Sequence, residues 1–120
     1  MNLHQLLVEQ SPDALIFADR EGVIRLWNAR AEALFGYSAQ EALGQSLDLI
    51  IPEHLRERHW QGYRRAMAEG RTRLGDKAML TRAAPKDGGK VYVELAFGVL
   101  TDPAGGVLGA LATGRRAAKP

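Results

Sequence analysis

Short apolar runs alternate with turn-forming residues along much of the chain, and their spacing predicts five β-strands. Residues 14–18 (ALIFA) and 23–27 are joined by Asp19-Arg20-Glu21-Gly22, a turn that ends in glycine, so the two runs predict a hairpin. Three further strands are predicted at residues 73–83, 90–100 and 107–114. Because strands that are joined by short turns pair antiparallel, we expect a five-stranded antiparallel sheet.

Helical spacing replaces this alternation at the N-terminus and between the second and third strands. Leu3, Leu6 and Leu7 share one side of a helix predicted for residues 2–10. Three more helices are predicted at residues 29–35, 38–44 and 52–69. They are inserted between two strands of one sheet and therefore have to cover one of its faces, which is an α+β arrangement.

The helix predicted at residues 52–69 has one mainly apolar side. Leu55, His59, Tyr63 and Met67 recur at every fourth position, so His59 lies on the side that should face the sheet. A histidine in such a position can ligate haem iron through a ring nitrogen. The alternative is a histidine that only packs in the core, which is the more frequent role of a lone histidine on an apolar helix face.

Composition narrows the class of protein. The 120 residues are enough for one domain with its own core. Sixteen Lys and Arg against fourteen Asp and Glu is near balance, so we expect no nucleic-acid partner. The absence of cysteine excludes disulfides, thiolate metal sites and a cysteine nucleophile. With no apolar run long enough to span a bilayer and no signal peptide, we expect no membrane association and a cytoplasmic location.

Residues 11–37, SPDALIFADREGVIRLWNARAEALFGY, resemble the opening of a PAS domain: a strand, D-x-x-G, a strand and W-N-x-x-A-E-x-L-F-G-Y. Lys86-Asp87-Gly88 and the D-x-x-G of residues 102–105 match turns that precede later strands of that family. The resemblance implies the PAS fold, with helices packed on one face of the sheet, and a sensory or signalling role. It divides the chain into an N-terminal helix (1–10), a PAS domain (11–114) and a loose tail (115–120).

Ile51-Pro52-Glu53 followed by Arg56-x-Arg58-His59 is similar to the haem-binding oxygen sensors of the FixL type. This resemblance implies that His59 ligates the iron of haem b. It further implies that Arg65 and Arg73 pair with the haem propionates, and that Met79, Leu95 and Phe97 lie on the distal side. The subgroup has an oxygen-binding arginine at the position of Met79, so Met79 is either a sixth iron ligand or a packing residue. Solvated surface charges remain the alternative for the two arginines.

Two functions follow from these expectations. The first is a sensor that binds a small ligand, haem b or another, between the sheet and the long helix and passes the signal through a dimer interface to an output domain or partner protein. The second is an interaction module without a ligand, which forms a homodimer through the N-terminal helix and the outer face of the sheet. An enzyme is not expected, because no nucleophile–base pair is visible, and flavin–cysteinyl photochemistry requires a cysteine.

Overall fold

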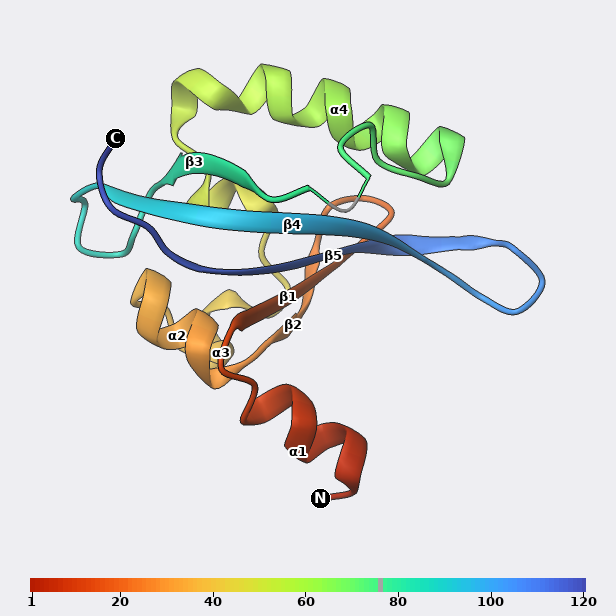
Figure 1. Ribbon diagram of the computed structural model, residues 1–120, viewed down its shortest axis with the longest axis horizontal. Helices are drawn as coiled ribbons and strands as arrows, with labels where there is room; N and C mark the ends of the chain where they lie inside the picture. Colours follow the sequence, from red (N-terminus) through yellow and green to blue (C-terminus); the bar gives the residue numbers. More distant parts are fainter. Residues whose placement is uncertain (76) are drawn as a thin grey trace.

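The computed structural model describes residues 1–75 and 77–120. Its five strands form one antiparallel sheet, as predicted, in the order β2-β1-β5-β4-β3 (Figure 1). The strands are β1 (Ala14–Asp19), β2 (Ile24–Trp27), β3 (Met79–Ala83), β4 (Val91–Thr101) and β5 (Val107–Arg116). The first and last strands therefore pair with each other in the middle of the sheet.

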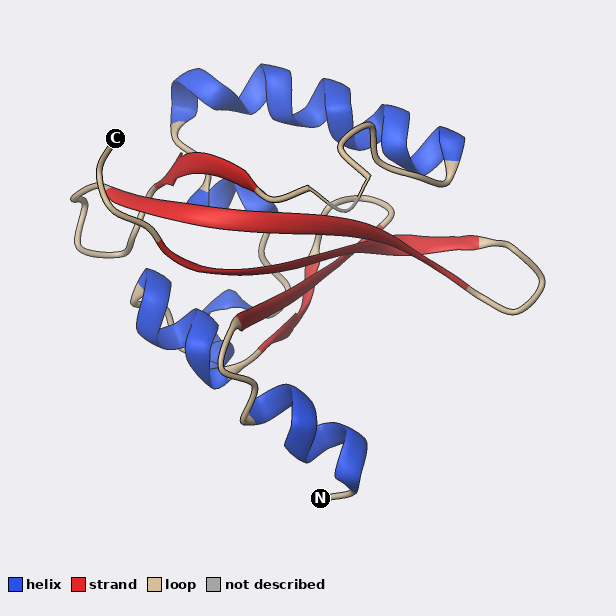
Figure 2. Cartoon of the chain, in the orientation of Figure 1, coloured by secondary structure: helices blue, strands red, loops and turns tan. Residues whose placement is uncertain are grey.

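The helices, drawn in blue in Figure 2, follow one another along the chain in the predicted order. They are α1 (Leu3–Glu9), α2 (Ala29–Phe35), α3 (Ala39–Ala42), the 3-10 turns η1 (Leu47–Ile50) and η2 (Glu53–Leu55), and α4 (Arg56–Glu69). Asn28 caps α2, and Ser38 forms a capping box with Glu41 at the start of α3, as expected from their side chains. No helix in the described part of the chain is long and apolar enough to cross a membrane.

Both α2 and α4 cover the same face of the sheet, which we call the inner face. Ala14 and Ile16 of β1 pack with α2 residues in the larger core cluster. Ala18, two positions further along the same face of β1, packs with Tyr63 and Met67 of α4 in a second cluster. The predicted α+β layering, with helices on one face, is confirmed.

Three element boundaries differ from the sequence prediction. The strand predicted at 73–83 begins only at Met79, because Leu74 and Gly75 form a turn in which Lys77 N–H donates to the Leu74 carbonyl. Residue 76 of that prediction lies outside the described residues. The helix predicted from 52 begins as a 3-10 turn and becomes α-helical at Arg56, since Pro52 has an extended backbone.

The third difference concerns the C-terminal tail, which was predicted to be loose from residue 115. β5 continues through Arg116, because Glu94 and Val93 of the long strand β4 still pair with Arg115 and Arg116. Arg115 is also held by an ion pair with Asp13. The last strand, predicted to end at residue 114, therefore ends two residues later.

Candidate functional site

The inner side of α4 carries the residues for which a site was predicted. Tyr63 and Met67 are buried against Ala18, with Val99 and Val107 of β4 and β5 packed around them. One turn earlier on the same helix, His59 is half-buried. The helical spacing seen in the sequence is therefore confirmed, and burial decreases from Met67 towards the start of the helix.

His59 has a buried ring nitrogen that lacks a partner. Its Nδ1 atom has no hydrogen bond to any residue of the described chain. Burial lowers the pKa of His59, and the nearby negative charge of Asp48 opposes this effect without cancelling it. The imidazole is therefore held neutral at pH 7, which is the protonation state that ligates a metal ion.

Trp60 lies beside His59 and ties α4 to two other segments. Its ring is 4.6 Å from the His59 ring, edge-on, and its Nε1–H donates to Asp48 Oδ1 over 2.8 Å. The far side of the Trp60 ring lies directly against Gly22, so that a side chain at Gly22 would overlap it. Glycine is thus required at position 22 for two reasons. The backbone has a φ of 80°, and the Trp60 ring occupies the space of a side chain.

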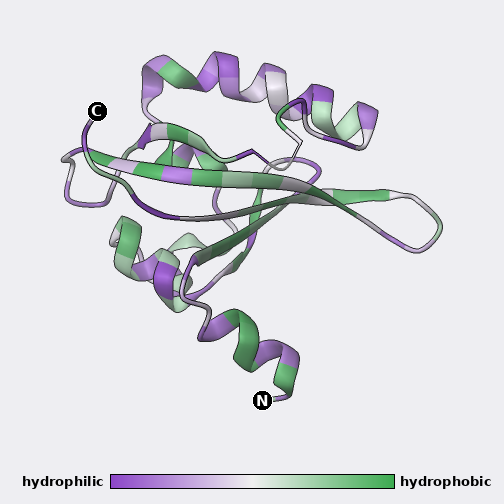
Figure 3. Cartoon of the chain, in the orientation of Figure 1, coloured by the Kyte–Doolittle hydropathy of each residue, from purple (hydrophilic) through white to green (hydrophobic). Residues whose placement is uncertain are grey.

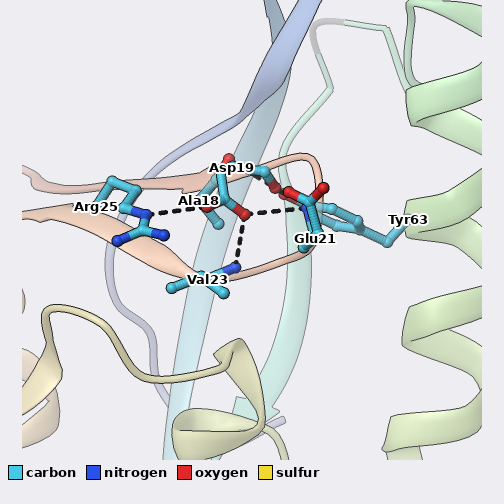
Figure 4. A network of polar contacts seen from close by, with 6 residues as sticks. All are labelled: Ala18, Asp19, Glu21, Val23, Arg25 and Tyr63. Atoms are coloured by element: carbon cyan, nitrogen blue, oxygen red, sulfur yellow. Dashed lines mark hydrogen bonds and ion pairs between the residues drawn. The ribbon is translucent and has the colours of Figure 1, made fainter.

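Tyr63 joins α4 to the same turn by a hydrogen bond (Figure 4). Its hydroxyl donates to the carbonyl of Asp19 at 2.6 Å, with the carbonyl of Ala18 at 3.2 Å. Burial raises the pKa of Tyr63 to about 12, so the hydroxyl remains a donor at neutral pH. The first half of α4 is consequently attached to the β1–β2 turn.

Across from α4, the predicted distal residues belong to the inner face of β3 and β4. Met79 and Leu95 are Cα partners on neighbouring strands, and Phe97 follows two positions later on the same face. Leu95 and Phe97 are half-buried, whereas Met79 is 40% exposed although it points to the helix side. The inner face is thus incompletely covered at the start of β3.

The two predicted propionate partners are not brought to His59 by any described contact. Arg65 and Arg73 are exposed, and neither is hydrogen-bonded or ion-paired with a residue in the ranges 1–75 and 77–120. Arg73 lines a hollow of 530 Å³ together with Glu69, Arg71 and Thr72 at the end of α4. That hollow does not include His59, so the roles predicted for these arginines remain predictions.

The contacts that attach α4 to the β1–β2 turn were not predicted from the sequence. Helical spacing indicates that Tyr63 faces inward, but not that its hydroxyl reaches a carbonyl of β1. Asp48 and Trp60 are twelve positions apart, and no local pattern connects them. The only signal in the sequence is the residue type, because a buried tyrosine or tryptophan needs a hydrogen-bond partner for its polar atom.

Comparisons with known proteins agree with this architecture. A model of the PAS fold family matches residues 3–117. Sensor protein FixL from Bradyrhizobium diazoefficiens is 48% identical over 48 residues, which are 40% of this chain and 10% of that protein. Oxygen sensor protein DosP from Escherichia coli is 27% identical over 90 residues, which are 75% of this chain and 11% of that protein.

The match also extends to solved structures. The PAS domain of a protein from Colwellia psychrerythraea superposes with a TM-score of 0.81 at 24% identity, covering 95% of this chain and 93% of that one. The chain spans about a tenth of the length of the two curated relatives, so it corresponds to one module of them. Its sheet order, its helices on one face and the family match over residues 3–117 together show that the chain belongs to the PAS fold family, whose members are generally sensory modules.

Proposed function

We propose that this PAS module senses a small ligand held between α4 and the inner face of the sheet, and that haem b is the group for which His59 is suited. The observation that carries the proposal is the buried Nδ1 atom of His59, which has no partner in the described chain. A buried polar atom without a partner costs about 1–3 kcal/mol, a cost that a bound ligand would remove. Similarity to a sensor protein and to an oxygen sensor protein supports the same reading.

The described side chains around His59 fit haem in part. The neutral imidazole of His59 would hold the iron, and the half-buried side chains of Leu95 and Phe97 offer an apolar wall on the opposite side. Met79 would either ligate the iron or pack against the ring, and Arg65 and Arg73 would pair with the propionates. When bound, haem would supply an iron whose state responds to gases or redox conditions. Trp60, which packs on Gly22, and Tyr63, which is hydrogen-bonded to the Asp19 carbonyl, would connect that site with the β1–β2 turn.

An absorption spectrum of the protein reconstituted with haem tests this proposal. We expect a Soret band that is lost or shifted in His59→Ala and unchanged in His54→Ala, a matched control at an exposed histidine of η2. Met79→Leu would shift the band only if the thioether ligates the iron. No Soret band in the wild type, or the same band in both histidine variants, would falsify the haem proposal.

A second candidate function is supported by a different observation. Leu3 and Leu7 of α1 are 66% and 61% exposed, and α1 stands apart from the sheet with hydrophobic bands along it (Figure 3). Such a helix is suited to pack on another polypeptide. In this alternative the module binds no ligand and acts by forming a homodimer through α1 and the outer face of the sheet.

In both cases the chain would act by binding rather than by catalysis. Because the aligned segments make up only 10% and 11% of the two curated relatives, we expect the module to work with an output domain or a partner protein. The expected location is the cytoplasm.

A further inference from the structure

A hollow of 170 Å³ lies between α2 and the C-terminal end of β5, and no residue of α4 lines it. Its apolar lining comes from Pro12, Ala14, Ala33 and Leu34. It is therefore separate from the site at His59, and what it binds does not depend on whether the protein holds haem.

Small residues produce this hollow. Ala14 and Gly114 are Cα partners on β1 and β5, and Ala33 faces them from α2. A side chain at Gly114 would overlap the carbonyl of Glu94 and the Leu95 side chain, so the strands themselves require glycine here. The floor of the hollow is thus formed by small residues on β1, β5 and α2, and arginine side chains surround it.

Three arginines, Arg30, Arg115 and Arg116, line the rim of the hollow. Arg115 is already engaged, since its Nε and Nη2 atoms donate to Asp13 Oδ1 over 2.8 and 2.6 Å. Arg30 and Arg116 are exposed and form no ion pair or side-chain hydrogen bond with any residue that the structure describes. Two guanidinium groups beside an apolar floor favour an occupant that carries carboxylates next to an apolar group.

The size of the hollow indicates which kind of occupant this is. Small-molecule pockets measure about 300–1,000 Å³, so a hollow of 170 Å³ is more suited to a single side chain. Its lining contains no aromatic residue on which a nucleic-acid base could stack. We propose that this groove docks an acidic peptide segment of a partner protein, with one apolar side chain in the hollow and flanking carboxylates on Arg30 and Arg116.

Fluorescence anisotropy with a labelled peptide tests the proposal. The probe is a peptide with one leucine flanked on both sides by Asp and Glu, titrated with the 120-residue chain at low and at physiological salt. We expect saturable binding that weakens at least tenfold in the Arg30→Glu/Arg116→Glu variant. A peptide with serine in place of leucine should bind several-fold more weakly, because it leaves the hollow unfilled.

The control variant is Arg64→Glu/Arg71→Glu, which makes the same change in charge at two exposed arginines away from the groove. Circular dichroism spectra identical to the wild type establish that both variants fold. The proposal is overturned if no saturable binding occurs, if both double variants lose affinity equally, or if the serine peptide binds as well. It is also overturned if a single-stranded oligonucleotide of equal charge binds as tightly through the same two arginines.

Discussion

At the scale of single residues, Asn28 shows how one side chain can hold several segments together. It is 1% exposed, and its Oδ1 atom accepts from the backbone N–H groups of Leu15 and Ala31. Its Nδ2 atom donates to the carbonyls of Val8 and Asp13. The role as a helix cap could be predicted because it depends on the next three residues, whereas the bonds to α1 and β1 depend on tertiary structure.

Asp19 carries a prediction about pH that also belongs to this scale. Burial alone would raise its pKa, but N–H donors from Val23 and Glu21 and the Arg25 guanidinium outweigh burial and lower the pKa below its usual 3.8 (Figure 4). The unfolded chain therefore binds more protons in acid than the folded one. This contribution to stability is present above about pH 4 and is lost as the pH falls through the folded pKa.

Asp19→Asn should consequently lower the free energy of unfolding at pH 7, and the difference from the wild type should shrink between pH 5 and pH 2. Urea unfolding at a series of pH values measures both curves. Glu53→Gln, which removes one exposed carboxylate, serves as the control for a general change of charge. A difference that stays constant with pH would show that the Asp19 carboxylate contributes through packing alone.

At the scale of elements, the contact between the β1–β2 turn and α4 depends on Gly22. Gly88, in the turn before β4, has a φ of 81°, nearly the same as the 80° of Gly22. Unlike Gly22, it has space for a Cβ atom, because no described atom lies within 4 Å of the position that this atom would take. Gly88→Ala should therefore lower the free energy of unfolding by about 1–2 kcal/mol, which is the cost of placing alanine in the left-handed conformation. Gly22→Ala should cost about 1–3 kcal/mol more, because the methyl group overlaps Trp60.

A double-mutant cycle separates these two effects. In a Trp60→Ala background, the cost of Gly22→Ala should fall towards the cost of Gly88→Ala, as measured by urea unfolding. If Gly22→Ala costs the same with and without the Trp60 ring, the ring does not restrict the turn. Trp60→Ala alone should also release the hydrogen bond to Asp48, so the cycle compares differences and not absolute values.

The elements themselves were predictable where local pattern decides them. Alternation along β4 and the caps of α2 and α3 depend on neighbouring residues, and they were predicted correctly. The start of β3 was not, because it depends on the pairing of Met79 with Leu95, a residue of a strand that follows later in the chain. The extent of β5 likewise depends on β4 being long enough to pair with Arg116.

At the scale of the whole molecule, the fold could be predicted and the site only in outline. Helical spacing places His59 on the inner side of α4, which the structure confirms. The proposed partners Arg65 and Arg73 come from a resemblance, and no described contact tests them. The spacing of residues along a helix or strand predicts which face each side chain is on. It does not predict how closely a helix face and a sheet face pack, because that depends on residues far apart in the sequence.

The dimer interface proposed for α1 and the outer face is the last prediction at this scale. The outer face carries Leu80 and Leu100, which are 45% and 44% exposed, in addition to the exposed leucines of α1. A stable interface buries about 800 Å² on each partner, which requires both surfaces to contribute. Leu3→Lys/Leu7→Lys should therefore shift a dimer to the monomer without unfolding it, since both side chains are mostly exposed.

Multi-angle light scattering across a range of protein concentrations measures the mass. Leu43→Lys, at the C-cap of α3, is the control because Leu43 is 45% exposed, close to the 44% of Leu100, and it should leave the mass unchanged. Leu100→Lys should weaken the dimer as the α1 variant does, because the two surfaces would belong to one interface. A dimer that survives both the α1 and the Leu100 substitutions would have to form through another surface, and a wild type that is monomeric at all concentrations would leave α1 to pack on a different protein.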